Sequence, residues 1–188
     1  MWLSTNNGAN WLDAKMGSFN VRAVGVWDRG VGITPYIYAG TARTGTALAK
    51  LYRTTNEGGS WSQITSYPPT NVTVVTAIRV RTDNNYIFVA SDVGLHRTTD
   101  DGVPWSNLPM PNGDNNILSL TIARDNQSIV YTGTAKAVYT STDGGSNWSE
   151  VSTGLGRMPL QSVAASSTNA WTVSKRSEER RVGKECRL

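Results

Sequence analysis

The sequence predicts an all-β protein built from repeated four-stranded antiparallel units. Three observations predict this class: the composition, short alternating apolar segments, and one eight-residue pattern that occurs four times. Gly, Thr, Ser and Asn are abundant, and seven Trp and seven Tyr stand beside only two Phe. No segment has sustained helical periodicity, and charged residues make up only 17% of the chain, which is low for a helical protein.

The repeated pattern is [ST]-x-[DN]-x-G-x-x-W, and its copies begin at residues 4, 54, 98 and 141, which are 50, 44 and 43 residues apart. It is typical of a tight turn between two antiparallel strands. The Asp or Asn accepts backbone N–H groups, Gly adopts positive φ, and the Ser or Thr hydroxyl adds a local bond. Burial of the Trp beneath the turn contributes about 2–3 kcal/mol. The predicted structural residues of the four turns are Ser4, Asn6, Gly8, Trp11, Thr54, Asn56, Gly58, Trp61, Thr98, Asp100, Gly102, Trp105, Ser141, Asp143, Gly145 and Trp148.

This pattern resembles the Asp-box, also called the BNR repeat, of sialidase-like, xyloglucanase-like and sortilin-like β-propellers. Matched apolar segments at 36–41, 87–92 and 130–135 lie upstream of the boxes, and alternating apolar pairs come before each of these segments. Three strands therefore precede each box and one strand follows it. We expect each unit to be one four-stranded antiparallel blade of a propeller.

The boxes also locate the blades along the chain. Blades are predicted to end near residues 15, 66, 109 and 152, which gives three full blades flanked by two half blades. Residues 1–175 are thus predicted to be an incomplete propeller that is cut at both ends. Pairing of the two half blades into a small four-bladed ring is the alternative.

The last residues, 176–188, differ sharply in composition from the rest of the chain. The string RSEERRVGKECR resembles the translation of a common sequencing adapter, so we expect a non-native, disordered tail. A genuine, solvated charged end is the alternative. Without the tail, 13 basic and 11 acidic residues remain, and the net charge falls from +4 to +2. The remaining charges form no basic stripe, which argues against nucleic-acid binding, and no apolar run is long enough to span a membrane.

The predicted binding residues come from one face of the propeller. Loops between strands two and three share this face with the connections between blades, whereas the boxes lie on the other face. The resemblance implies that ligands bind on the first of these faces and that the boxes are structural. Arg43, Tyr67, Asp114 and Arg157 are the predicted ligand-binding side chains, and Lys136 lies in one of the same turns.

Asp92 is the predicted catalytic residue. Its segment resembles the stretch in which xyloglucanase-type propeller hydrolases place a catalytic Asp after the second strand of a blade. Glycoside hydrolysis needs two carboxylates about 5–10 Å apart, and the partner of Asp92 would lie elsewhere on the ring. Whether the protein is an enzyme therefore stays open, because the sequence holds no complete catalytic site.

His96, the only histidine, occupies the repeat position that Trp2, Tyr52 and Tyr139 fill in the other units. We predict that it packs as one more flat ring. The only cysteine, Cys186, lies in the tail, so the sequence predicts neither a metal site nor a cofactor. Arg53 and Arg97 precede boxes at equivalent positions, which favours a structural role over the arginine cluster of a sialidase.

The leading functional hypothesis is an extracellular glycoside hydrolase of the xyloglucanase type, to which this chain contributes structural blades and part of a glycan-binding cleft. The partners would be an oligo- or polysaccharide and the missing blades of the same propeller. The alternative is a non-enzymatic ligand- or protein-binding propeller, similar to sortilin or to photosystem assembly factors. A third hypothesis is a fragment without function, because incomplete rings fold poorly. The sequence indicates no localisation, although an extracellular or periplasmic full-length protein is expected.

Overall fold

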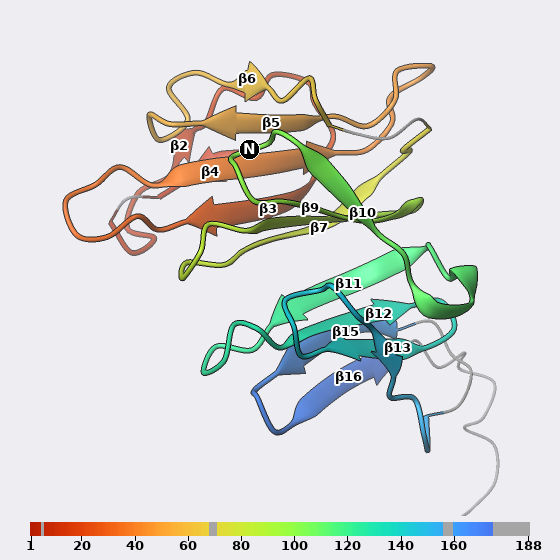
Figure 1. Ribbon diagram of the computed structural model, residues 1–188. Helices are drawn as coiled ribbons and strands as arrows, with labels where there is room; N and C mark the ends of the chain where they lie inside the picture. The colour runs from red at the N-terminus through yellow and green to blue at the C-terminus, as the bar shows by residue number, and fades with distance from the viewer. Residues whose placement is uncertain (5, 68–70, 156–159, 175–188) are drawn as a thin grey trace, which may run out of the picture.

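The computed structural model describes residues 1–4, 6–67, 71–155 and 160–174, which form five antiparallel sheets in chain order. The first and last sheets have two strands each, and the three sheets between them have four strands each. The predicted three full blades and two half blades are therefore confirmed. Figure 1 shows the first half blade beside the upper blade and the last half blade at the lower end of the array.

Each full blade follows the chain from strand one to strand four. The first half blade contains β1 (Trp2–Leu3) and β2 (Leu12–Asp13). Blade two contains β3 (Val21–Trp27), β4 (Tyr36–Thr41), β5 (Leu51–Thr54) and β6 (Ser62–Gln63). Blade three contains β7 (Val75–Val80), β8 (Ile87–Ser91), β9 (Gly94–Thr98) and β10 (Trp105–Leu108). A short 3-10 turn, η1 (Pro111–Gly113), precedes blade four, which contains β11 (Ile117–Ile122), β12 (Val130–Thr134), β13 (Val138–Ser141) and β14 (Ser149–Glu150). The last half blade contains β15 (Leu160–Ala165) and β16 (Ala170–Ser174).

The first strand of each blade lies innermost. β3 contacts β7, β7 contacts β11, and β11 contacts β15, so the four strands line one groove of about 240 Å³. Arg22 and Arg79 are the charged side chains of this groove. The strands of each blade then follow outward in chain order, as expected for propeller blades.

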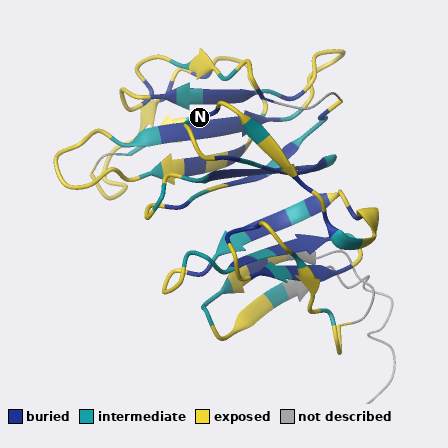
Figure 2. Cartoon of the chain, in the orientation of Figure 1, coloured by how far each residue is buried: buried dark blue, intermediate teal, exposed yellow. Residues whose placement is uncertain are grey.

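The core consists of apolar layers between neighbouring blades. One layer joins blades two and three through side chains such as Tyr38 and Ile78, and another joins blades three and four through Phe88 and Leu120. Figure 2 shows that the middle strands of the blades are buried along almost their whole length. Continuous burial of strand two explains why its sequence is an apolar run without alternation.

A hydroxyl side chain closes the turn between strands two and three in every full blade. Thr41 accepts the N–H of Lys50, Ser91 donates to the carbonyl of Gly94, and Thr134 accepts the N–H of Ala137. These hydroxyls occupy equivalent positions at the end of strand two. They compensate backbone groups that the turn leaves without a partner in the sheet.

The boxes form tight turns held by side-chain to backbone bonds. In the last box, Ser141 accepts the N–H of Gly145 at 2.7 Å, and Asp143 accepts the N–H groups of Ser146 and Asn147, each at 2.9 Å. These donors hold the pKa of the Asp143 carboxyl low, at about 2, with the Asn147 N–H as the largest cause. The third box differs, because Pro104 has no N–H and stands where the other boxes have a residue whose backbone N–H donates to the Asp or Asn side chain. Within the described residues, the side chain of Asp100 accepts no hydrogen bond.

The box of each full blade also contacts the preceding sheet, which the sequence pattern does not reveal. The box glycines have positive φ, and a Cβ at Gly58 would meet Ala14 at 3.0 Å, whereas one at Gly102 would meet Ile64 at 3.1 Å. The indole N–H of Trp61 donates to the carbonyl of Ala14 at 2.6 Å. The shape that the boxes share therefore serves packing between sheets as well as the turn itself.

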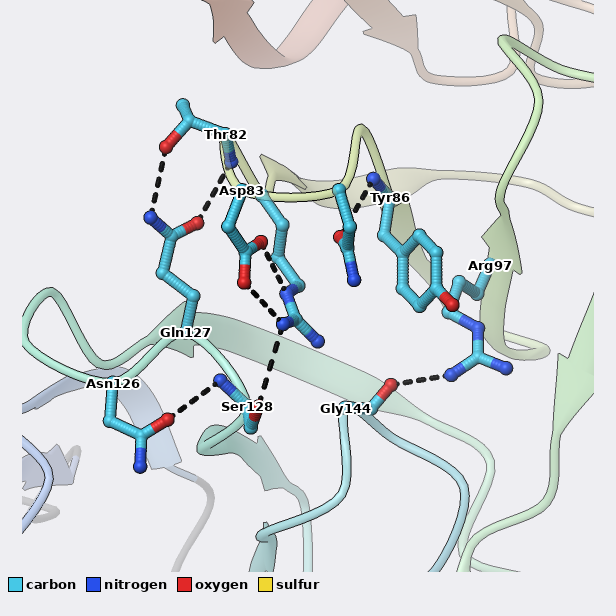
Figure 3. A network of polar contacts seen from close by, with 10 residues as sticks. Thr82, Asp83, Tyr86, Arg97, Asn126, Gln127, Ser128 and Gly144 are labelled. Atoms are coloured by element: carbon cyan, nitrogen blue, oxygen red, sulfur yellow. Dashed lines mark hydrogen bonds and ion pairs between the residues drawn. The ribbon is translucent and has the colours of Figure 1, made fainter.

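Polar side chains join blade three to blade four on the box face. The side-chain amide of Gln127 accepts the N–H of Thr82 at 2.8 Å and donates to its hydroxyl at 2.9 Å (Figure 3). Arg97 stacks on Tyr86 and donates to the carbonyl of Gly144 at 2.5 Å. Arg53 makes equivalent contacts one blade earlier. It stacks on Tyr36 and forms an ion pair with Asp101. The structural role predicted for these arginines is thus confirmed.

Two apolar residues of β3, the first inner strand, are more exposed than their repeat counterparts. Val24 is 43% exposed and Val26 is 53% exposed, whereas Ile78, at the position of Val24, is completely buried. Ile78 packs on Gly25 of the preceding blade. The sheet before β3 has no inner strand, since it consists of β1 and β2, and this leaves Val24 uncovered.

Candidate functional site

The candidate site lies on the face that carries the loops between strands two and three together with the connections between blades. We call this surface, formed by residues 42–50, 64–67, 71–74, 92–93, 109–116, 135–137 and 151–155, the loop face. The connection to blade three lies against blade two, because the N–H of Arg43 donates to the carbonyl of Thr73 at 2.6 Å. The boxes lie at the other ends of the strands, where the N–H of Gly144 donates to the carbonyl of Ser128.

Asp92 joins the turn between β8 and β9 to the connection that enters blade three. Its carboxylate accepts the N–H of Thr73 at 3.1 Å, the N–H of Val74 at 3.2 Å, and the hydroxyl of Thr73. Three donors thus surround one partly buried carboxylate. This arrangement holds the connection in place, and the catalytic role of Asp92 stays a prediction.

Tyr67 lies near Asp92 but beneath the surface. Its side chain is 2% exposed and packs edge-on against Trp105, with ring centroids 4.9 Å apart, and against His96 at 5.9 Å. Burial, and then the negative charge of Asp92, raise the pKa of the Tyr67 hydroxyl. Arg43 is closer to the surface, where its Nε donates to the carbonyl of Gly45 at 2.7 Å. The structure therefore brings Arg43, Tyr67 and Asp92 together at the boundary of blades two and three.

Asp114 forms the equivalent link one blade later. It is 3% exposed, lies on the connection that enters blade four, and accepts the hydroxyl of Thr134 at the start of the turn between β12 and β13. In blade three the carboxylate lies on the turn, whereas in blade four it lies on the connection. Each carboxylate thus bonds the connection that enters its blade to the turn between strands two and three of the same blade.

A pocket of about 460 Å³ opens beside Asp114. It is lined by Asn112, Lys136, Tyr139 and Glu150, together with two alanines of the turn between β12 and β13. Lys136 and Glu150 are exposed, whereas the ring of Tyr139 is buried and its hydroxyl donates to the carbonyl of Pro111 at 3.4 Å. Burial first, then the charges of Asp114 and Glu150, raise the pKa of the Tyr139 hydroxyl. The lining of the pocket thus combines the amide of Asn112, the ammonium group of Lys136 and the carboxylate of Glu150 with the ring of Tyr139.

The predicted binding residues divide between these places. Arg43 and Tyr67 lie with Asp92, Asp114 supports the wall of the pocket, and Arg157 lies outside the described residues, as does the predicted tail at 176–188. Sequence reasoning did not select Asn112, Tyr139 or Glu150. One signal for Glu150 was present, because it follows the box tryptophan by two residues and must therefore lie on the outer strand. Its place beside Lys136 depends on the sheet register, which pairs Tyr139 with Glu150.

Replacing Asp92 by alanine is expected to lower the free energy of unfolding by about 2 kcal/mol, because two backbone N–H groups lose their acceptor. Asp92→Asn should lose less, since an amide oxygen keeps one acceptor. Asp28→Ala is the control, because exposed Asp28 accepts one N–H within its own loop and its loss should cost less than about 0.5 kcal/mol. Urea denaturation measures all three, and equal losses for Asp92→Ala and Asp28→Ala would contradict the bridging role.

These features define a class of protein. Repeated four-stranded antiparallel sheets with innermost first strands, joined by boxes of one pattern, are the blades of an Asp-box β-propeller. Within the described residues no helix is long and apolar enough to cross a membrane. In the same part of the chain, His, Cys, Asp and Glu form no group of three that could hold a metal ion.

The chain belongs to the Sortilin-Vps10 family, whose model, described as sortilin, neurotensin receptor 3, matches residues 49–188. A search of curated proteins gives no significant match. Among solved structures, the fold is similar to that of a GH74 xyloglucanase from Xanthomonas campestris, with a TM-score of 0.63 and 17% identity over 79% of this chain and 26% of that one. A GH74 enzyme from Niastella koreensis gives a TM-score of 0.61 and 17% identity over 82% of this chain and 26% of that one.

A smaller protein has a similar fold as well. YCF48 from Cyanidioschyzon merolae gives a TM-score of 0.54 and 15% identity over 85% of this chain and 57% of that one. The chain spans 26% of the length of either GH74 structure. At these identities the similarity shows the propeller fold and leaves function open.

Proposed function

We propose that this chain forms blades of a propeller that binds a polar, hydroxyl-rich ligand of the oligosaccharide class on its loop face. The pocket of about 460 Å³ beside Asp114 carries the proposal. Asn112 and Lys136 supply donors, Glu150 supplies acceptors, and sugar hydroxyls can bond to both kinds of group. Small-ligand pockets commonly measure about 300–1,000 Å³, so the volume suits one or two sugar rings.

A binding role fits the surrounding residues better than a catalytic role does. The carboxylates of Asp92 and Asp114 bond to threonines of the loops that they hold together, which leaves Glu150 as the exposed carboxylate of the pocket. Recognition of hydroxyl groups needs only these fixed donors and acceptors. Membership of a family whose description names a receptor also supports binding.

Calorimetric titration with cellotetraose and with xyloglucan oligosaccharides tests the proposal. Lys136→Ala is expected to weaken binding about tenfold, because a charge-assisted hydrogen bond is lost. Lys50→Ala is the matched control, since Lys50 lies on the loop face of blade two, outside the pocket. The proposal fails if neither sugar binds, or if the two lysine variants bind with the same affinity.

A segment of an extracellular glycoside hydrolase is the second candidate, favoured by the structural similarity to a GH74 xyloglucanase. The hydroxyl- and amide-rich composition agrees with an extracellular protein. In this case Asp92 acts with a second carboxylate about 5–10 Å away. Release of reducing ends from xyloglucan measures the activity. Turnover by the wild-type protein that is lost in Asp92→Asn would support this candidate, and turnover equal in both would exclude Asp92 as its catalytic residue.

A further inference from the structure

The groove between the inner strands is cationic. β3, β7, β11 and β15 line it, and its volume of about 240 Å³ is far more room than one water molecule needs. Each of these strands contacts the next one along the chain, so the groove lies within the array. Its lining holds two arginines, Arg22 of β3 and Arg79 of β7, and within the described residues it holds no Asp or Glu. The groove therefore favours a negatively charged ligand.

A β-bulge at the same place in each inner strand brings Arg22 into the groove. The pairing of strand one with strand two skips one residue, which is Arg22 in β3, Thr76 in β7 and Leu118 in β11. A bulge residue has no partner in the ladder, and the bulge changes the direction of its side chain. All three residues line the groove. Blade two thus places a guanidinium group where the next two blades place a hydroxyl group and an aliphatic chain.

Neither guanidinium group of the groove has a carboxylate partner in the described part of the chain, where the ion pairs involve other arginines. Arg79 donates from Nη1 to the carbonyl of Ile78 at 2.8 Å, which leaves its other N–H groups for a ligand. Burial lowers the pKa of the Arg79 guanidinium, and no nearby carboxylate offsets this effect. Because arginine stays charged in proteins, an anion in the groove would compensate for the lost hydration.

Ser119 of β11 adds a neutral donor to the same groove. It is 8% exposed, and within the described residues its hydroxyl group has no hydrogen-bond partner. Buried hydroxyl groups in native proteins are nearly always bonded to protein, water or a ligand. Packing does not require this one, because Ala23 and Ala77 occupy the equivalent position after the bulge in β3 and β7. The hydroxyl group of Ser119 is therefore available to a ligand in the groove.

We propose that the groove binds a tetrahedral oxyanion of the sulfate or phosphate class, either free or as an ester. Arg22 and Arg79 donate charge-assisted hydrogen bonds to its oxygens, and Ser119 donates a neutral one. These donors come from three successive strands, so they suit a ligand with oxygens on several sides better than a planar carboxylate with two. No residue lines both this groove and the pocket at Lys136, so the proposal does not depend on the binding of sugars.

Calorimetric titration of the full chain with sodium sulfate, sodium phosphate and sodium acetate, at an ionic strength fixed with sodium chloride, tests the site. Sulfate and phosphate should bind saturably, and acetate should bind about tenfold more weakly than either. Arg79→Gln should weaken sulfate binding about tenfold, because a charge-assisted hydrogen bond is lost. Arg79→Lys should lose less, since it keeps the charge. Arg124→Gln is the matched control, because exposed Arg124 lies between β11 and β12, outside the groove.

Ser119→Ala removes the neutral donor and leaves a residue that the other blades already hold at this position. It should keep the stability of the wild type in chloride and weaken sulfate binding about fivefold. Glucose 6-sulfate distinguishes the two sources of the anion, since an ester should bind more tightly than inorganic sulfate if the groove recognises a modified sugar, and less tightly if it recognises the free ion.

Three results would overturn the proposal. They are the absence of saturable binding of both sulfate and phosphate, acetate binding as tight as sulfate binding, and equal sulfate affinities of Arg79→Gln and Arg124→Gln. Lys136→Ala should leave sulfate binding unchanged, because Lys136 lies outside the groove. Sulfate binding that is lost in Lys136→Ala and kept in Arg79→Gln would place the anion in the pocket beside Asp114 and would also contradict the proposal.

Discussion

Replacing Gly25 by alanine is expected to lower the free energy of unfolding by about 3 kcal/mol. A Cβ at this position would lie 2.5 Å from Cγ2 of Ile78 and 3.0 Å from its Cβ. Ile78 is completely buried between blades two and three, and its branched side chain cannot move away without disturbing that layer. Overpacking of this kind costs about 1–3 kcal/mol, and here it separates two blades.

A second substitution shows whether the clash is the cause. Ile78→Leu keeps the side-chain volume but removes the Cγ2 methyl group, so alone it should cost less than about 1.5 kcal/mol. Combined with Gly25→Ala, it should restore at least about 1 kcal/mol relative to the sum of the two single losses. Urea denaturation of the four proteins measures this coupling. If the two losses of free energy were strictly additive, the backbone conformation at residue 25, and not the contact with Ile78, would be the reason for glycine there.

The boxes made the blades predictable, because a tight turn depends on residues close together in sequence. Their spacing gives the number of sheets, and the apolar run at 87–92 agrees with β8 to within one residue. The contacts between blades were not predictable in this way. Arg53 reaches Asp101 across 48 residues, and no local pattern links the two. The exposure of Val24 likewise depends on which strands the neighbouring sheet contains.

The sequence predicted which face of the blades carries the candidate site, but it did not predict which residues meet there. Alternation of loops along the blades places Asp92 and Asp114 among the loops between strands two and three and the connections, but their partners, Thr73 and Thr134, lie 19 and 20 residues away in sequence. The sequence does not distinguish a carboxylate that bridges two loops from a carboxylate that faces a ligand. The pocket at Lys136 depends on the register between β13 and β14, which brings Glu150 beside Tyr139. Pairing across strands decides this arrangement, and residue type alone cannot.

Stability is expected to fall by about 3 kcal/mol between pH 7 and pH 4 because of His96. The side chain packs as a flat ring beside Tyr67, as predicted from the repeat, and it is 4% exposed. Within the described residues its Nδ1 has no hydrogen-bond partner. Burial lowers the pKa of His96 from 6.5 to about 4, because the charged imidazolium would lose its hydration.

The sign follows from proton binding. Between pH 6.5 and pH 4 the unfolded chain binds a proton at His96 that the folded protein does not bind, so acid favours unfolding. The stabilisation is complete above about pH 7, declines as the pH falls through this window, and levels off below the folded pKa. A difference of about 2.5 pKa units corresponds to about 3 kcal/mol.

His96→Phe isolates this contribution, because carboxylates also titrate at the acidic end of the range. The repeat places Tyr52 and Tyr139 at equivalent positions, so an aromatic ring fits there, and phenylalanine leaves no buried nitrogen without a partner. Urea denaturation of both proteins at half-unit steps from pH 7.5 to pH 4 should show a steep loss for the wild type and a shallow one for the variant. Parallel curves would mean that His96 becomes protonated in the folded protein without cost, and that burial does not control its charge.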